Sequence, residues 1–333
     1  MSQLTDETDD TDVLIIGAGP AGLYGAYYAG FRGLNVTVMD VLPQLGGQIS
    51  AMYPEKPIFD IAGFLSVRGR DLVDGLVAQA EPYSPRYLLG HRAMELTHDP
   101  DDGRPVVRSD QGATVRAGAV VITGGVGTFT PRALPAGEEF LGRGLEYFVP
   151  DPSAHADKDV VVVGGGDSAF DWAATLSPLA RSVTLVHRTA RFRAHAASVE
   201  KVRSLGVEIV TDCEVSRLTG GACLEQAEIR HRTTKETRLV PAGTVVAALG
   251  FLADLGPLQH WGLELEARKI TVDTRMATNL PRVFAAGDIT DYPGKVRLIS
   301  VGFGEAATAV NNAATVIDPE AALFPGHSTE KEH

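Results

Sequence analysis

Two glycine-rich turns, each lying between a strand pattern and a helix pattern, constrain the fold of this chain more than any other feature. The first turn, Gly17-Ala-Gly-Pro-Ala-Gly22, follows the apolar stretch Asp12–Ile16 and precedes a helical pattern from Leu23 to about Ala29. The next apolar stretch, Asn35–Met39, ends in Asp40. These elements make one βαβ unit, the context in which a G-x-G-x-x-G turn binds a dinucleotide.

The same pattern returns in the second half of the chain. The strand pattern Lys158–Val163 leads into Gly164-Gly-Gly-Asp-Ser-Ala169, and a helix to about Leu176 is followed by the strand pattern Ser182–Val186. A chain of 333 residues has room for two domains. We therefore predict an α/β fold with two Rossmann-like dinucleotide-binding domains; the alternative for each turn is a tight βα connection that binds nothing.

Glycine in such turns allows a sharp bend and lets a pyrophosphate approach the backbone, where the helix N-terminus offers unpaired N–H groups to the anion. The residues predicted to bind in this way are Gly17, Gly19, Pro20, Ala21 and Gly22 in the first turn, and Gly164, Gly166, Asp167, Ser168 and Ala169 in the second.

The residue at the end of the second strand of each unit separates the two ligands. Asp40 lies about 20 residues after the first turn begins, where a carboxylate accepts hydrogen bonds from ribose hydroxyls and repels a 2′-phosphate, so this site suits FAD or NAD. At the matching place in the second unit stand His187 and Arg188, followed by Arg191 and Arg193. Arginine binds phosphate oxygens well, which favours NADPH or NADP⁺ here. The alternative is a solvated basic loop.

Two apolar strand patterns that end in glycine, Ala119–Gly125 and Thr244–Gly250, lie on either side of the second unit. We interpret them as the two crossings between domains. On this interpretation residues 1–123 and 251–333 form an FAD-binding domain into which an NADPH-binding domain, 124–250, is inserted. The segment Arg282–Asp288 and a helix from about Gly304 to Val316 would complete the first domain, with Asp288 holding the ribityl and pyrophosphate region of FAD or serving only to form a turn.

Charge and composition exclude several classes of function. The formal net charge of −12 argues against general binding of nucleic acid. No apolar run approaches the length of a membrane span, and the polar, acidic start of the chain does not resemble a signal peptide, so we expect a cytoplasmic protein without a membrane association. The two cysteines, Cys213 and Cys223, are too few and too oddly placed for a disulfide framework or a metal site.

Longer strings carry a resemblance to a known family. Besides the two turns and Ala285-Ala-Gly-Asp288, they are Leu42-Pro-Gln-Leu-Gly-Gly-Gln48, Met52-Tyr-Pro-Glu-Lys56, Asp167-Ser-Ala-Phe-Asp-Trp172, Phe192-Arg-Ala-His195, Gly302-Phe-Gly-Glu305 and Ala309-Val-Asn-Asn312. Over nearly the whole chain the sequence resembles the ferredoxin–NADP⁺ reductases of the thioredoxin-reductase-like type.

The resemblance implies a homodimer and a role for several further residues in binding FAD. Tyr53 and, from the C-terminal tail, His327 would stack on the flavin, while no side chain acts as a catalytic group. The tail often comes from the partner subunit in this family; His327 as a mere tail residue is the alternative. The FAD-binding positions implied are Asp40, Gly47, Gln48, Tyr53, Ala93, Phe129, Asp288, His327, Ser328 and Thr329, and those for NADPH include His187, Arg188 and Arg193.

One departure concerns the phosphate motif, which in the family usually reads His-Arg-Arg and here reads His187-Arg188-Thr189. Arg191 could substitute for the missing arginine, but the preference for NADPH over NADH would be weaker than usual. The sequence does not decide how strong that preference is.

A thioredoxin reductase would carry Cys-x-x-Cys shortly before the second turn, where this chain has Tyr147–Pro152 and no sulfur. Without a dithiol, electrons cannot leave the flavin by thiol–disulfide exchange. We therefore expect FAD-dependent electron transfer between NADPH and ferredoxin or flavodoxin. Two alternatives remain: a reductase for another acceptor, such as a quinone, a small disulfide or free flavin, and a non-catalytic flavin-binding redox sensor.

Overall fold

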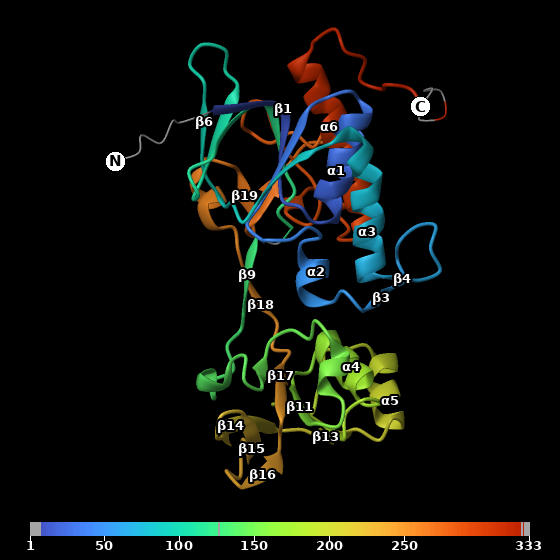
Figure 1. The fold of residues 1–333 in the computed structure, drawn as a ribbon, viewed down its shortest axis with the longest axis vertical. Helices are drawn as coiled ribbons and strands as arrows, with labels where there is room; N and C mark the ends of the chain where they lie inside the picture. Colours follow the sequence, from blue (N-terminus) through green and yellow to red (C-terminus); the bar gives the residue numbers. More distant parts are fainter. Residues whose placement is uncertain (1–7, 126, 328, 330–333) are drawn as a thin grey trace. The chain divides into compact units, whose positions relative to one another are not determined.

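The computed structural model describes residues 8–125, 127–327 and 329, without the side chains of residues 128–130 and 251–253. The chain divides into two compact units. Unit 1 consists of Met1–Thr128 and Ala253–His333, and unit 2 is Phe129–Leu252. Each is described by itself below (Figure 1).

Unit 1 is built on a seven-stranded sheet in the order β5-β2-β1-β8-β7-β6, with β21 also paired to β8. Strands β1, β2, β5, β8 and β21 are mutually parallel, whereas β6 and β7 form an antiparallel hairpin on β8. The strands are β1 (Thr8–Ile16), β2 (Val36–Asp40), β5 (Arg86–Leu89), β6 (Ala93–His98), β7 (Pro105–Ser109), β8 (Thr114–Ile122) and β21 (Val283–Ala285).

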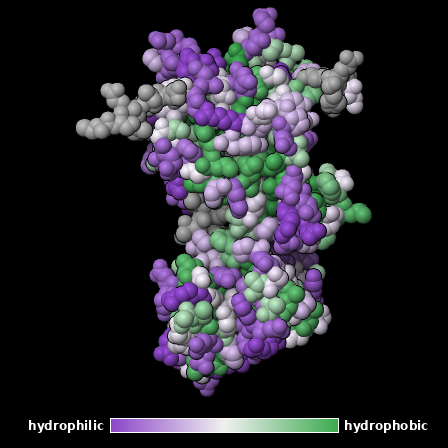
Figure 2. Space-filling view, in the orientation of Figure 1, coloured by the Kyte–Doolittle hydropathy of each residue, from purple (hydrophilic) through white to green (hydrophobic). Residues whose placement is uncertain are grey.

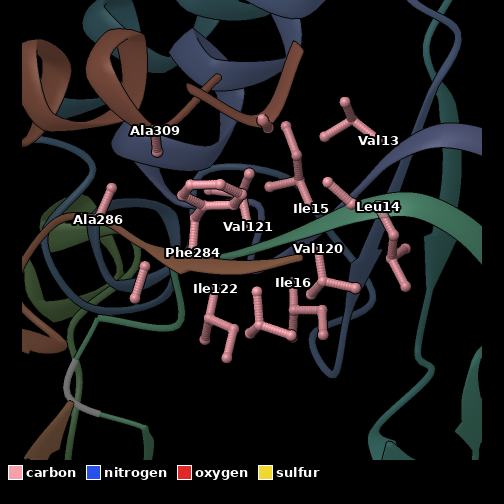
Figure 3. Packing of buried hydrophobic residues seen from close by; sticks show 14 of the residues in the cluster. Val13, Leu14, Ile15, Ile16, Val120, Val121, Ile122, Phe284, Ala286 and Ala309 are labelled. Carbon is pink, nitrogen blue, oxygen red and sulfur yellow. The ribbon is translucent and has the colours of Figure 1, made fainter. Parts of the chain in front are cut away.

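Three helices of unit 1 pack on one another along this sheet: α1 (Pro20–Phe31), α3 (Gly69–Ala80) and α6 (Ile299–Ile317) (Figure 1). The parallel strands are buried on both faces, so they read as continuous apolar runs rather than alternating ones. Figure 3 shows side chains of β1 and β8 gathered near Phe284 of β21 and Ala309 of α6. The core of the unit therefore lies directly behind the first glycine turn.

Smaller elements complete unit 1. They are α2 (Gln48–Met52), the hairpin of β3 (Pro57–Ile58) and β4 (Val67–Arg68), the 3-10 turns Glu81–Tyr83 and Gly256–His260, and the three-stranded sheet of β19 (Leu265–Glu266), β20 (Lys269–Thr271) and β22 (Thr290–Asp291). The loop between β3 and β4 exposes Phe59, Phe64 and Leu65. In Figure 2 the tip of this loop is the apolar projection at the edge of the view.

Unit 2 contains a five-stranded parallel sheet, ordered β10-β17-β11-β12-β13, and an antiparallel sheet, β14-β15-β16. Its elements are β10 (Leu145–Glu146), β11 (Asp159–Val163), α4 (Asp167–Leu176), β12 (Ser182–Val186), α5 (Ala196–Ser204), β13 (Glu208–Val210), β14 (Cys213–Gly220), β15 (Leu224–His231), β16 (Thr237–Pro241), β17 (Thr244–Ala247), and the 3-10 turns Glu138–Phe140 and Pro152–His155.

The two glycine-ended strands interpreted above as crossings are interior strands that lead directly into the connections between the units. β8 pairs with β1 and β17 pairs with β11, so each is an interior strand beside the strand that leads into a glycine turn. The chain connects the units after these strands, through β9 (Thr128–Pro131) and β18 (Phe251–Asp254), which pair with each other. Their apolar composition reflects burial within the two sheets.

Candidate functional site

The first glycine turn is closed by contacts between backbone atoms. The N–H of Gly17 donates to the carbonyl of Met39 at 2.8 Å, which joins the turn to the end of β2. Gly17 has φ +117°, and a Cβ at this position would lie 2.7 Å from the carbonyl carbon of Thr123. A Cβ on Gly22 would lie 1.8 Å from the oxygen of Gly17. The packing of unit 1 itself therefore requires glycine at both positions.

Gly19 differs from the glycines on either side of it. Its φ of −73° suits any residue, and a Cβ there would meet nothing within 4 Å. It is the N-cap of α1, where no side chain caps the helix and the first turn carries no acidic residue. The free N–H groups and the space above them fit a pyrophosphate. Because the protein itself has room for a side chain at Gly19, a bound group is what explains the absence of one.

Asp40, the last residue of β2, lies beside this turn. One carboxylate oxygen accepts the N–H of Ala18 at 2.5 Å, and the other accepts the N–H of Leu42 at 2.7 Å. Burial raises the pKa of this carboxyl group above its ordinary value, while the two N–H donors act in the opposite direction. The carbonyl of Asp40 accepts the N–H of His91 at 3.0 Å, which brings the segment leading to the buried Ala93 alongside.

The loop that leads to Gln48 folds over the turn from the other side. The N–H of Gly46 donates to the carbonyl of Ala18 at 2.8 Å, and a Cβ on Gly47 would lie 2.9 Å from the Cα of Gly19. The side-chain nitrogen of Gln48, Nε2, lies 3.1 Å from the point where a Cβ on Gly125 would stand. Gly47 and Gln48 are thus placed between the turn and the end of β8.

Tyr53 and Asp288 approach the same region of unit 1. Burial raises the pKa of Tyr53, and the negative charges of Asp288 and Asp60 add to the effect. Asp288 follows Gly287, whose missing Cβ would lie 3.3 Å from the Cβ of Ala21 in α1. Residues from four separate segments therefore surround the first turn, as an extended dinucleotide would require.

The structure does not bring the C-terminal candidates to this place within one chain. Arg32, at the far end of α1, donates to the carbonyls of Ala322 and Leu323 at 2.7 and 2.8 Å. The 12 residues of α1 separate this anchor from the glycine turn by about 18 Å. His327 contacts Phe324, and the exposed Thr329 follows. Ser328 lies outside the described residues, as does the side chain of Phe129, whose backbone belongs to β9.

The second glycine turn repeats the local geometry in unit 2. A Cβ on Gly164 would lie 2.5 Å from the oxygen of Ala248, so the packing requires glycine there. Gly166, the N-cap of α4, has φ −101° and open space where a Cβ would stand, like Gly19. Ser168 is exposed beside it, and the buried Ala169 packs against Gly164. The carboxylate of Asp167 already has a partner within the protein, because one of its oxygens accepts the backbone N–H of His195 at 2.8 Å.

The basic segment after β12 folds back onto this turn. The N–H of Arg193 donates to the carbonyl of Gly165 at 2.7 Å, and the ring of His187 covers Gly165. Burial lowers the pKa of His187 below its ordinary 6.5, and the charges of Arg188 and Arg193 lower it further, whereas a hydrogen bond from the ring to the backbone of Arg191 raises it. His187 is therefore neutral at pH 7, and the exposed Arg188 and Arg193 supply the positive charge.

Arg232, which the sequence interpretation did not include, lies at the same place. It follows β15, and its guanidinium donates to the carbonyl of Arg188 at 3.1 Å. The backbone N–H of Arg232 also donates to the carbonyl of Asp212 at 2.8 Å. Besides Arg188, Arg191 and Arg193, a fourth arginine thus lies beside the end of β12, and no local sequence pattern connects it to the turn.

Neither of the two cysteines belongs to a glycine turn. Cys213 begins β14 and is buried, which raises the pKa of its thiol, whereas Cys223 is exposed; both are free thiols. Among the described residues no three His, Cys, Asp or Glu side chains gather in a way that could hold a metal ion. No helix among the residues that the structure describes is long and apolar enough to cross a membrane.

Comparisons with known proteins agree with this geometry. The family model described as pyridine nucleotide-disulphide oxidoreductase matches residues 11–313. The chain is 65% identical to the ferredoxin–NADP reductase of Salinispora arenicola, over 96% of this chain and 99% of that protein. It is 47% identical to the ferredoxin–NADP reductase of Thermus thermophilus, over 97% and 98%.

Among solved structures, the thioredoxin reductase of T. acidophilum superimposes with a TM-score of 0.77 at 26% identity, covering 93% of this chain and 98% of that one. The predicted α/β class with two dinucleotide-binding domains is confirmed, and so is the predicted family resemblance.

Proposed function

The chain belongs to the pyridine nucleotide-disulphide oxidoreductase family, and from this premise we propose that it transfers electrons between NADPH and ferredoxin through bound FAD. The observation that carries the proposal is the pair of glycine turns with different partners. Both turns have a middle glycine that the protein itself does not require. Asp40 follows the first, and arginines follow the second, which matches FAD in unit 1 and NADPH in unit 2.

In the proposed reaction, NADPH and two oxidised ferredoxins give NADP⁺, a proton and two reduced ferredoxins, or the reverse. When bound, FAD accepts a hydride and passes electrons on one at a time. The chain would contribute binding and orientation: the N-terminus of α1 would hold the pyrophosphate, Asp40 the adenosine ribose, and Gln48, Tyr53 and Asp288 the flavin half. No side chain needs to transfer a proton for the hydride step itself.

The ferredoxin assignment rests on the relatives and on the absence of a dithiol. The relatives from Salinispora arenicola and Thermus thermophilus are both named for ferredoxin. The segment Tyr147–Pro152, where a thioredoxin reductase would carry its cysteines, contains none. Flavodoxin, a second small one-electron carrier, is an alternative partner. We also propose a cytoplasmic location, where NADPH is available to the enzyme.

A homodimer is part of the same proposal. The C-terminal segment is anchored by Arg32 at the far end of α1 from the glycine turn, which supports a tail that reaches a second copy of the chain rather than the flavin of its own unit 1. A second copy of the chain would allow this tail to cover the partner subunit's flavin. Sedimentation analysis of the intact protein, compared with a chain shortened after residue 321, would reveal whether the tail contributes to such an assembly.

The function is tested by NADPH-driven reduction of cytochrome c with and without added ferredoxin. We expect slow reduction by the holoenzyme alone and much faster reduction once ferredoxin carries the electrons. A fast NADPH-dependent reduction of a quinone with no response to ferredoxin would favour the other-acceptor alternative. Binding of FAD with no rapid turnover of any acceptor would favour a redox sensor.

A double substitution, Cys213→Ser with Cys223→Ser, is expected to leave ferredoxin reduction within about twofold of the parent. Neither thiol stands in the segment where a thioredoxin reductase places its dithiol, and the thiol of Cys213 is buried in the core of unit 2. Oxidised thioredoxin should be a poor substrate for both proteins, because its reduction requires a thiolate relay. Loss of ferredoxin reduction in the double variant, or rapid thioredoxin reduction by the parent, would contradict the proposal.

A further inference from the structure

A buried ion pair lies behind the segment that carries Asp288. Lys295 contacts a carboxylate oxygen of Glu305 in α6, and the two side chains are only 3% and 5% exposed. The hydroxyl of Tyr292 donates to the same oxygen at 2.5 Å. The ammonium of Lys295 also lies 5.4 Å from the centre of the Tyr292 ring. None of these three side chains belongs to the candidate dinucleotide contacts described above.

The pair holds both backbone groups of Gly287. The other oxygen of Glu305 accepts the N–H of Gly287 at 2.7 Å, and Lys295 donates to the carbonyl of Gly287 at 3.0 Å. The hydroxyl of Thr290 donates to that carbonyl as well, at 2.8 Å. Gly287 has φ +82°, a conformation that side chains other than glycine rarely adopt. Its N–H is therefore held by Glu305, and its carbonyl by both Lys295 and Thr290.

Asp288 is the next residue, so the fixed backbone of Gly287 also sets the direction of the chain at Asp288. Its own carbonyl accepts a hydrogen bond from Lys269 at 2.6 Å. On the opposite side, Gly287 rests against Ala21 in the first turn of α1, and α6 packs on it through Gly302. The segment thus occupies a fixed place between α1 and α6, with Gly287 against the first glycine turn and the charge of Asp288 close enough to Tyr53 to raise its pKa.

Stability alone does not account for a charged pair here. Removing two charges from water costs several kcal/mol each, and apolar residues of similar volume are often as stabilising as a buried ion pair or more so. An apolar pair would however leave the buried N–H of Gly287 without an acceptor, and that orphan donor is costly. The arrangement is thus better explained by what it orients than by what it stabilises.

We propose that Glu305 is a positioning residue for FAD, which acts through the N–H of Gly287 to hold Asp288 in its cofactor-binding orientation; Lys295 balances its charge, and without Lys295 the carbonyl of Gly287 keeps the hydroxyl of Thr290 as a donor. The inference rests on the proposed function, because it assumes that unit 1 binds FAD. Tyr292 supports the pair by donating to Glu305, and burial together with that hydrogen bond raises the pKa of its hydroxyl to about 12, so it stays a donor at neutral pH. Asp288 remains the group that faces the cofactor.

The test compares two double variants that differ only at position 305. Lys295→Met with Glu305→Gln removes both charges but keeps an oxygen that can accept the N–H of Gly287. Lys295→Met with Glu305→Leu removes the charges and the acceptor at similar volume. We expect the Gln form to bind FAD within about threefold of the parent and the Leu form to bind roughly ten- to a hundredfold more weakly.

Affinity is measured by quenching of FAD fluorescence on apoprotein, with thermal unfolding of the apoproteins and visible circular dichroism of bound FAD as further readouts. Equal FAD affinity in both variants, at equal apoprotein stability, would overturn the inference. Should the Leu form not fold, the Gln form decides alone: a loss of affinity above tenfold overturns the proposal. A parent protein that binds no FAD would contradict the proposed function instead, which keeps the two failures distinct.

Discussion

Replacement of Gly19 by valine is expected to weaken FAD binding about a hundredfold or more while leaving the stability of the apoprotein almost unchanged. The residue has an ordinary φ, and a Cβ there meets no protein atom within 4 Å, so the backbone and its neighbours leave room for a side chain to begin. A valine would occupy the space in which a pyrophosphate reaches the N–H groups of α1. Loss of two charge-assisted hydrogen bonds at about 1.5–3 kcal/mol each gives an effect of this size.

Gly75→Val is the matched control. Gly75 lies in α3, is exposed, and likewise has nothing within 4 Å of its missing Cβ, but no glycine turn is near it in the sequence. Its FAD affinity should equal that of the parent. Affinity is read from fluorescence titration of apoprotein and stability from thermal unfolding. An unchanged FAD affinity in Gly19→Val would show that the first turn does not hold the pyrophosphate.

The second large effect is expected from Arg188→Ala combined with Arg193→Ala. The KM for NADPH should rise about a hundredfold or more, and that for NADH only slightly, because NADH lacks the 2′-phosphate. Each charge-assisted hydrogen bond to that phosphate contributes about 1.5–3 kcal/mol, which is about ten- to a hundredfold apiece. The neutral state of His187, whose pKa is lowered by burial and by these arginines, leaves the charge recognition to them.

Arg181→Ala serves as the control for loss of an exposed arginine. Arg181 immediately precedes β12, at the end of the strand opposite to Arg188, and pairs with Asp159 at 2.9 Å. It should leave both KM values as they are. Equal increases for NADPH and NADH in the double variant would mean that the arginines do not read the 2′-phosphate. Adding Arg232→Ala to the double variant would then show whether this more distant arginine contributes.

The sequence predicted the elements around both turns well, because their signals are local. The strand Ser182–Val186 is predicted and found with the same bounds. Helix α6 begins at Ile299, five residues before the predicted start at Gly304. Glycine disfavours a helix interior, yet Gly302 lies inside α6, at the point where the helix packs on Gly287 and Ala21. Tertiary packing therefore extended a helix that local propensity would have shortened.

The sequence alone did not show that Ala119–Gly125 and Thr244–Gly250 are interior strands as well as the approaches to the connections between the units, which follow just beyond them. Their apolar composition and final glycines are equally typical of a buried strand and of a connection between domains. Only strand pairing separates the two, since β8 joins β1 and β17 joins β11 within their own sheets. The pairing partners lie about a hundred residues away in the first case, beyond the reach of any local pattern.

By itself the sequence determined the family, the two dinucleotide turns and the contrast between Asp40 and the arginines after β12. These depend on glycines and strand ends that are neighbours along the chain, where spacing alone fixes which groups meet. Only the tertiary structure decided that Arg232 joins Arg188, that Lys295 and Glu305 hold Gly287, and that Arg32 anchors the tail away from its own glycine turn. Those contacts join segments far apart in the sequence, and it is the packing of α1, α6 and the sheets that brings them within hydrogen-bond distance.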